Sequence, residues 1–173
     1  MNHPMRVILM GLLVVSMAAC TKKATKTDMP PASNDTTTTA DTTPTTEDGK
    51  FGPGDLETDS CLRQRVVYFD FDQADIKSEA AAIVACHGKY LSDVPGSKMT
   101  LEGHADERGS REYNIGLGER RGNAVSSALQ ANGGSAAQIT VNSYGEERPT
   151  CSESDESCWG KNRRVEIVYT QAQ

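Results

Sequence analysis

Beyond residue 60, the chain carries four short apolar runs that predict β-strands. Each run is rich in β-branched or aromatic residues, and polar or glycine-containing segments separate the runs, which is typical of strands. In the last run Val165, Ile167 and Tyr169 alternate with Glu166, so one face of that strand is expected to be buried. The predicted strands are 66–69, 99–103, 139–144 and 165–169.

Two of the intervening segments have the spacing of amphipathic helices. Apolar or small residues recur over 76–91, with Asp75 or Ser78 available as the helix cap and a proline–glycine pair beyond the end. A second helix is predicted over 111–131, where a glycine pair follows. Alternating strands and helices imply a sheet with helices packed on it. The expected fold class is therefore α+β, a compact two-layer domain with a four-stranded mixed sheet against two main helices.

Composition divides the chain into three parts. Residues 1–19 carry Arg6 and then a short apolar run that is too short to span a bilayer, which indicates an export signal. Residues 20–60 are rich in Thr, Pro, Ser and Asp and contain almost no large apolar residues. Such a segment cannot bury enough surface to offset its ordering entropy, so it is expected to be a disordered tether. Residues 61–173 remain for one folded domain.

The end of the predicted signal indicates a lipid anchor. Met17, Ala18, Ala19 and Cys20 resemble the bacterial lipoprotein cleavage box, in which the cysteine becomes the first residue and is acylated. An ordinary secretory signal with a chance cysteine is the alternative. Thr21, rather than aspartate, follows the cysteine, and by resemblance to bacterial sorting rules this favours the outer membrane. The expected location is the periplasmic face of the outer membrane, lipid-anchored.

Net charge and cysteine count narrow the function classes further. The chain has a formal net charge of −6 and no basic stripe with interleaved aromatics, which argues against a nucleic-acid partner. Apart from Cys20, it has four cysteines, an even number that suits disulfides in an oxidising compartment. Three pairings are possible. The favoured one joins Cys151 to Cys158, which flank a short polar loop, and Cys61 to Cys86. A zinc site is the alternative, but no C-x-x-C pair is present.

The strongest candidate chemistry lies where the second strand leads into the second helix. Asp106 follows the strand in a polar loop, and Arg121 falls in the apolar row of the helix. A buried guanidinium needs a partner, because an unpaired buried charge is costly. A guanidinium grips a carboxylate and an aspartate receives an ammonium, so the two together suit a zwitterionic amino-acid group. The alternatives are a turn or capping role for Asp106, and for Arg121 an ion pair with Asp106 or a bond to a carbonyl.

Other polar residues near this loop are expected to be structural. His104, with Glu102 and Asp106 at alternate positions, offers a metal site, but a hydrogen-bonded residue at the strand end is the simpler interpretation. Of Arg163 and Arg164, one is expected to pair with a loop carboxylate or carbonyl and the other to be solvated. Neither a nucleophile with an evident base nor a phosphate loop is present. We therefore expect no catalytic residue, no metal and no cofactor.

Several motifs together resemble the OmpA-like peptidoglycan-binding domain. The resemblance runs from about residue 66 to residue 169, with the motifs in the family's order. They are VYFDFD at 67–72, GHADERG at 103–109, EYNIGLGERR at 112–121, SYGE at 143–146 and KNRRV at 161–165. Ala105 replaces a threonine that is common in the wider family, and the four cysteines are not a general family feature. No function is evident for the acidic loop between Cys151 and Cys158.

The resemblance implies a ligand and the residues that hold it. Members of the family bind the meso-diaminopimelate of the peptidoglycan stem peptide without covalent chemistry. Carried over residue by residue, Asp106 and Arg121 are its main expected partners. The other positions expected at the same cleft are Phe71 and Asp72 of the first loop, and Asn114 and Leu117 of the helix.

Lipidated members of the family also work in the Tol system. The resemblance therefore implies a periplasmic Tol protein (TolB-like) as partner, and a role in anchoring the outer membrane to the cell wall during division. Two alternatives stay open at this point. One is a peptidoglycan-processing enzyme, metal-assisted through His104. The other is a general structural wall-binding lipoprotein without a Tol role.

Overall fold

The computed structural model of the chain describes residues 49–171. The predicted signal segment, Cys20 and the linker as far as residue 48 lie outside the described residues. Within the described range, no helix combines the length and apolar character needed to cross a membrane.

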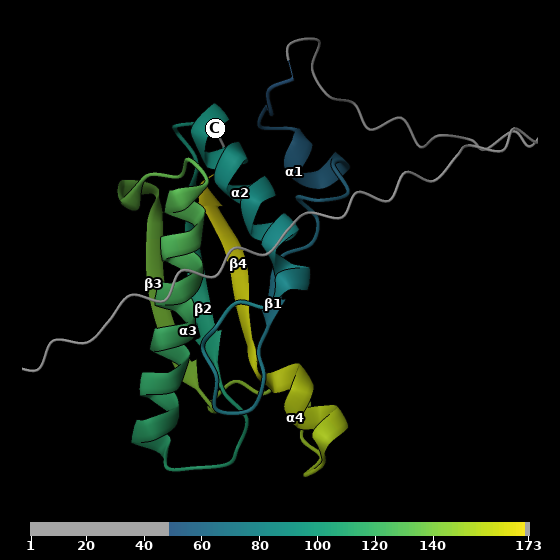
Figure 1. Cartoon of the computed structure of the whole chain (residues 1–173), viewed down its shortest axis with the longest axis vertical. Helices are drawn as coiled ribbons and strands as arrows, with labels where there is room; N and C mark the ends of the chain where they lie inside the picture. Colours follow the sequence, from purple (N-terminus) through teal and green to yellow (C-terminus); the bar gives the residue numbers. More distant parts are fainter. Residues whose placement is uncertain (1–48, 172–173) are drawn as a thin grey trace, which may run out of the picture. The chain divides into compact units, whose positions relative to one another are not determined.

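A four-stranded mixed sheet forms one layer of the domain (Figure 1). Its strands are β1 (Val66–Tyr68), β2 (Lys98–His104), β3 (Ile139–Gly145) and β4 (Arg164–Gln171). The order across the sheet is β1-β4-β2-β3; β4 runs antiparallel to both β1 and β2, whereas β2 and β3 are parallel. All four predicted strands are confirmed, with ends that differ by one or two residues.

Two helices form the second layer, on one face of the sheet (Figure 1). They are α2 (Ala81–Asp93), which follows a 3₁₀ turn at Ser78–Ala80, and α3 (Arg111–Ala131). The predicted capping of the first helix is wrong. Neither Asp75 nor Ser78 caps α2, because the 3₁₀ turn separates them from its start, and the Ser78 hydroxyl donates to Glu79 instead. The α3 helix is capped by Ser110, whose Oγ accepts from the Tyr113 backbone N–H at 3.2 Å.

The core lies between the two layers. Alternate strand residues such as Leu101 and Ile167 are at most 1% exposed and pack with Val125 and Leu129 of α3. Two glycines bring α3 directly onto β2: a Cβ atom at Gly103 would overlap the carbonyl of Gly118. This contact fixes the amino-terminal half of α3 over the end of β2, where the candidate loop begins.

The folded part begins earlier than the predicted boundary at residue 61. A short helix, α1 (Asp55–Thr58), buries Leu56 against Leu62, Tyr90 and Val94. Phe51 packs against the same cluster. Composition alone did not reveal this, because a few apolar residues in a polar segment produce no periodic pattern.

A further short helix, α4 (Glu156–Asn162), was not predicted. It includes Cys158, the second cysteine of the acidic loop, and ends shortly before β4; of its residues, Cys158 and Asn162 are buried. Both favoured disulfides are confirmed: Cys61–Cys86 and Cys151–Cys158.

Candidate ligand-binding site

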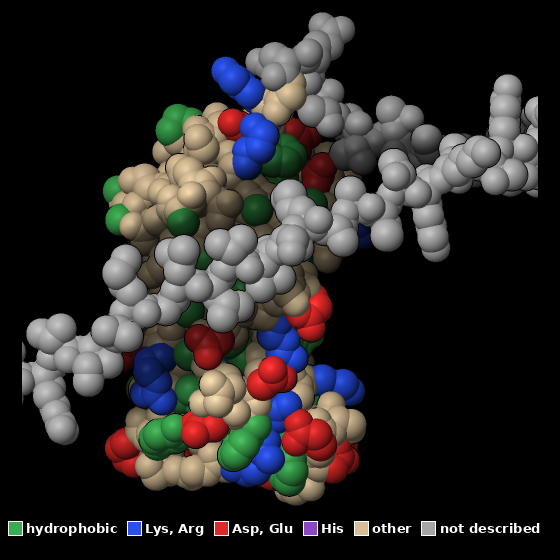
Figure 2. Space-filling model, viewed as in Figure 1, with side chains coloured by type: hydrophobic (Ala, Val, Ile, Leu, Met, Phe, Trp, Pro, Cys, Tyr) green, Lys and Arg blue, Asp and Glu red, His purple; other side chains and the backbone are tan. Residues whose placement is uncertain are grey.

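A hollow of about 190 Å³ opens at the end of the domain where α3 begins. Three segments supply its lining: the loop after β1, the loop after β2, and the first turns of α3. The lining residues are Phe71, Asp72, Asp106, Arg108, Gly109, Tyr113, Asn114 and Leu117. At the end of the domain where α4 lies, charged and hydrophobic side chains are closely interleaved (Figure 2). Of the six predicted ligand-binding residues, the hollow brings together all but Arg121.

Asp106 is 4% exposed and is held by two arginines. Its carboxylate accepts from Nη2 and Nε of Arg108 at 2.7 and 3.1 Å, from the Arg108 backbone N–H at 3.1 Å, and from Nη1 of Arg163 at 3.2 Å. Burial by itself would raise the pKa of Asp106, but the hydrogen bonds from Arg108 and Arg163 outweigh it and hold the pKa below its usual range. The carboxylate is therefore ionised at neutral pH.

Arg121 is fully buried and binds main-chain carbonyls. Its Nε donates to the carbonyl of Gln73 at 2.8 Å, its Nη1 to that of His104 at 2.8 Å, and its Nη2 to that of Asp70 at 3.0 Å. Burial lowers the pKa of Arg121 to about 10, so the side chain is still a cation at neutral pH. Of the alternatives raised from the sequence, bonding to carbonyls is the one observed in this structure. The guanidinium ties the loop after β1 to the end of β2, and so fixes two walls of the hollow.

Asn114 supplies an unmet hydrogen-bond acceptor. The residue is fully buried, and its Nδ2 donates to the carbonyls of Asp106 and Arg108 at 3.1 and 3.3 Å and to the Glu146 carboxylate. Its Oδ1 has no hydrogen-bond partner among the described residues. A buried acceptor without a partner is costly.

The loop after β1 and the helix α3 meet at the opening of the hollow. The Tyr113 hydroxyl donates to the Asp72 carboxylate. Asp72 has a φ of 56°, in the left-handed region, which aspartate tolerates better than most residues. Phe71 beside it is 55% exposed, an unusual position for a large apolar ring.

Arg108 is the main site residue that the sequence analysis missed. Its guanidinium carbon lies 4.0 Å from the centre of the Phe71 ring and 4.1 Å from that of Trp159, while the same group holds Asp106. The indole N–H of Trp159 donates to Glu107 at 3.0 Å. The spacing of Asp106 and Arg108 was a local signal for their pairing. The two rings come from distant parts of the chain and left no such signal.

The two arginines at the start of β4, Arg163 just before it and Arg164 as its first residue, are both buried, so the expectation that one is solvated is wrong. Arg163 and Arg164 are each 6% exposed. Arg163 bonds Asp106, the Phe69 carbonyl at 3.1 Å and Glu156 at 2.5 Å. Arg164 pairs with Glu166 at 2.6 Å. Each finds a carboxylate within the fold, which offsets the cost of burial.

His104 also differs from its prediction as a hydrogen-bonded residue. It is 2% exposed, and neither ring nitrogen has a hydrogen-bond partner among the described residues. The ring stacks on Tyr144, with ring centres 5.6 Å apart. Burial lowers the pKa of His104 to about 4, so the ring is neutral at pH 7. Within the described range, the groups close enough to share a metal ion each contain a disulfide pair, and neither includes His104.

Known proteins resemble this chain over most of its length. The sequence model of the OmpA family matches residues 68–163. The peptidoglycan-associated lipoprotein of Pseudomonas putida is 46% identical over 115 residues, 66% of this chain and 69% of that protein. The peptidoglycan-associated lipoprotein of Legionella pneumophila is 38% identical over 164 residues, 92% of this chain and 93% of that protein. The crystal structure of the peptidoglycan-associated lipoprotein from Burkholderia pseudomallei superposes with a TM-score of 0.64 at 39% identity, covering 65% of this chain and 96% of that one.

Proposed function

Because the chain belongs to the OmpA family, we propose that its folded domain binds peptidoglycan and holds the side-chain end of a diaminopimelate residue in the hollow beside Asp106. One observation carries this proposal. The lining of one small hollow includes Asp106, an ionised carboxylate, and Asn114, whose Oδ1 has no hydrogen-bond partner among the described residues. Two acceptors of this kind suit an ammonium group, which has three donors and no acceptor.

The ligand's carboxylate requires positive charge and free donors. Arg108 is part of the lining, and Arg121 fixes two walls of the hollow. Arg121 is fully buried and outside the lining, so it contributes positive charge and holds the walls. In this proposal the N–H groups of Arg108 that do not hold Asp106, together with backbone groups of the loop at Phe71 and Asp72, serve the carboxylate. Binding is non-covalent, and family membership identifies a binding domain and not an enzyme, so the peptidoglycan-processing alternative is withdrawn.

The site is tested by removing the charge of Asp106 while keeping its shape. D106N should weaken binding to purified sacculi by roughly 30-fold or more, about 2 kcal/mol, because a buried charge pair is broken. D75N is the matched control, since Asp75 is an exposed aspartate outside the hollow, and it should bind like the unmodified chain. Equal binding of D106N and D75N in a sacculus pull-down would defeat the assignment of the site.

The diaminopimelate itself is tested with two stem peptides that differ at the third residue. Lysine carries the same ammonium as diaminopimelate but lacks the second carboxylate. Calorimetric titration should show weaker binding of the lysine peptide. Equal affinities would remove the diaminopimelate preference and leave peptidoglycan binding in place.

The proposal extends to an outer-membrane anchor with a Tol partner. All three of the similar proteins reported above are named lipoproteins, and the residues before Cys20 resemble a lipoprotein cleavage box. C20A should lose incorporation of labelled palmitate and leave the outer-membrane fraction. Co-purification of a periplasmic TolB-like protein with the unmodified chain supports the Tol role. Its absence would favour the alternative of a structural wall-binding lipoprotein.

A further inference from the structure

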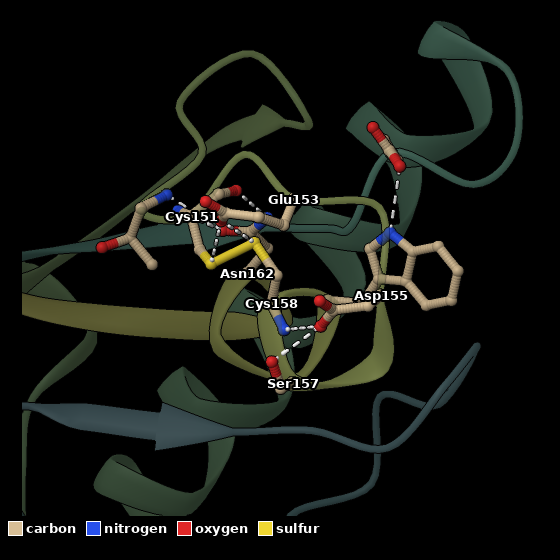
Figure 3. Close-up of a disulfide and its surroundings, with 9 residues drawn as sticks. Cys151, Glu153, Asp155, Ser157, Cys158 and Asn162 are labelled. Atoms are coloured by element: carbon tan, nitrogen blue, oxygen red, sulfur yellow. Dashed lines mark hydrogen bonds between the residues drawn. A yellow bond between two sulfur atoms is a disulfide. The ribbon is translucent and has the colours of Figure 1, made fainter.

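The α4 segment is held as a closed unit beside the hollow. The Cys151–Cys158 disulfide joins the first turn of α4 to the loop before it, and the Asp155 carboxylate accepts from the Cys158 backbone N–H at 3.0 Å (Figure 3). The Asn162 side chain accepts from the backbone N–H groups of Thr150 and Cys151 at 2.9 and 3.2 Å and donates to the Cys151 carbonyl at 2.8 Å. The segment therefore has little freedom to move while the disulfide is intact.

Two side chains of α4 reach the arginines that hold Asp106. The Trp159 ring lies 4.1 Å from the guanidinium carbon of Arg108. The Glu156 carboxylate lies 2.5 Å from Nη2 of Arg163 and 3.6 Å from Nη2 of Arg108. Contacts of an arginine with an aromatic face and with a carboxylate both restrict its position. The chain of contacts thus runs from the disulfide to α4, then to both arginines, and ends at Asp106.

We propose that α4, stapled by the Cys151–Cys158 disulfide, is a positioning element of the binding site: through Trp159 and Glu156 it keeps Arg108 and Arg163 on Asp106 and so sets ligand affinity. The inference rests on the proposed function for the identity of the ligand. It assigns a role to the acidic loop for which the sequence offered none. Trp159 and Glu156 act through the two arginines and are positioning residues.

The proposal follows from how flexible side chains bind. Asp106 meets a ligand with defined geometry only if its carboxylate has one orientation, and two long arginine side chains fix that orientation only if they are themselves fixed. Arg108 lies against Phe71, which is 55% exposed and adds little restraint alone. A loop between Cys151 and Cys158 that is free to move would release Trp159 and Glu156 together. The arginines would then sample several positions, and each bound ligand would have to order them again.

The second disulfide provides a matched control. Cys61–Cys86 joins the segment before β1 to α2, close to the cluster of Leu56, Leu62 and Tyr90. The helix α1, which packs in the same cluster, lies at the end of the domain away from α4 (Figure 1). Replacing both of its cysteines by serine removes one cross-link, as in C151S/C158S, but leaves the α4 segment intact.

The experiment compares C151S/C158S with C61S/C86S in the full mature chain. The first readout is the affinity for a diaminopimelate stem peptide by calorimetry, and the second is the pKa of the Asp106 carboxyl group by NMR titration without ligand. C151S/C158S should lose at least tenfold in affinity and show an Asp106 pKa that rises toward the ordinary aspartate value. C61S/C86S should change neither, whatever it does to the melting temperature.

A second variant keeps the disulfide and removes only the aromatic contact. W159L should weaken peptide binding, and W159F should restore most of it, because a phenyl ring still covers the Arg108 guanidinium. Trp159 is the single tryptophan of the chain, so its fluorescence in the unmodified protein should change when the peptide binds. Wild-type affinity in W159L would overturn the positioning role of the ring.

The outcomes separate the two proposals. If the unmodified chain does not bind the peptide, the proposed function fails, while the Asp106 pKa still decides whether α4 positions the carboxylate. If the peptide binds but both disulfide variants give the same affinity and the same Asp106 pKa as the unmodified chain, the positioning inference is wrong and the proposed function stands.

Discussion

At the scale of single residues, burial of polar groups decides the behaviour of this domain. Asp106 is buried but has enough donors to remain ionised, whereas His104 is buried with no hydrogen-bond partner among the described residues and is neutral. Both side chains are almost fully buried, so the difference in charge comes from their hydrogen-bond partners and not from the degree of burial. Two arginines serve Asp106, but the nearest carboxylate oxygen to His104, on Glu166, is 4.0 Å from Nε2 and is already paired with Arg164.

His104 is expected to make the fold less stable in mild acid. Its pKa in the folded state is about 4, below the ordinary value of 6.5, so the unfolded chain takes up the proton first as the pH falls. The free energy of unfolding should therefore fall between pH 6.5 and pH 4, by about 2–3 kcal/mol from this residue. H104F keeps a stacked ring on Tyr144 but has no imidazole to protonate. Urea unfolding at pH 7 and at pH 4.5 should therefore show a smaller decrease in the free energy of unfolding for H104F than for the unmodified chain. An identical pH dependence in both proteins would contradict it.

At the scale of elements, close packing between α3 and β2 holds the walls of the hollow together. The helix carries Asn114 and Leu117 near its start and Arg121 one turn beyond Leu117, so its position on the sheet sets all three. Glycines at the contact permit this approach. They also weaken the helix by itself, since glycine costs about 1 kcal/mol relative to alanine in a helix interior.

Alanine substitutions at two glycines of α3 distinguish the effect of tight packing on stability from the effect of helix propensity. In G118A the new Cβ would overlap the Ser143 hydroxyl and lie 2.8 Å from the Gly103 carbonyl oxygen, so we expect a loss of about 1–3 kcal/mol of stability. In G116A the nearest outside atom is the flexible Arg120 Nη1 at 3.4 Å, so that variant should be neutral or more stable by up to about 1 kcal/mol. Chemical denaturation measures both. A G118A protein as stable as G116A would show that the contact is not tight.

At the scale of the whole molecule, the two ends of the domain have different tasks. One end, where α1 packs against α2, carries the Cys61–Cys86 disulfide and a small second cluster of buried apolar residues (Figure 1). The other end carries α4 and the loops that line the hollow. Changes at the α1 end should therefore affect mainly the stability of the domain, and changes at the α4 end mainly its ligand binding.

Shortening the chain tests this division. A protein that starts at Cys61 lacks Phe51 and Leu56, which pack in the second cluster, and the Leu56 carbonyl, which accepts from Arg65 Nη2 at 2.8 Å. Compared with a protein that starts at residue 49, it should lose about 2–4 kcal/mol of stability, because buried apolar surface becomes exposed. Its affinity for a stem peptide, measured where both proteins are folded, should be unchanged. A large loss of affinity would mean that the two ends are coupled.

Features that depend on neighbours along the chain could be predicted from the order of the residues. The four strands, the helix α3, the position of Asp106 in the loop before that helix and of Asn114 and Leu117 on it all follow from local periodicity and spacing. The partners of the charged groups, in contrast, depend on how the chain folds in three dimensions. Arg108 meets rings at positions 71 and 159, and Arg163 reaches Asp106 from 57 positions away. Such partners are set by where the sheet and loops bring distant segments together, and no local pattern records them.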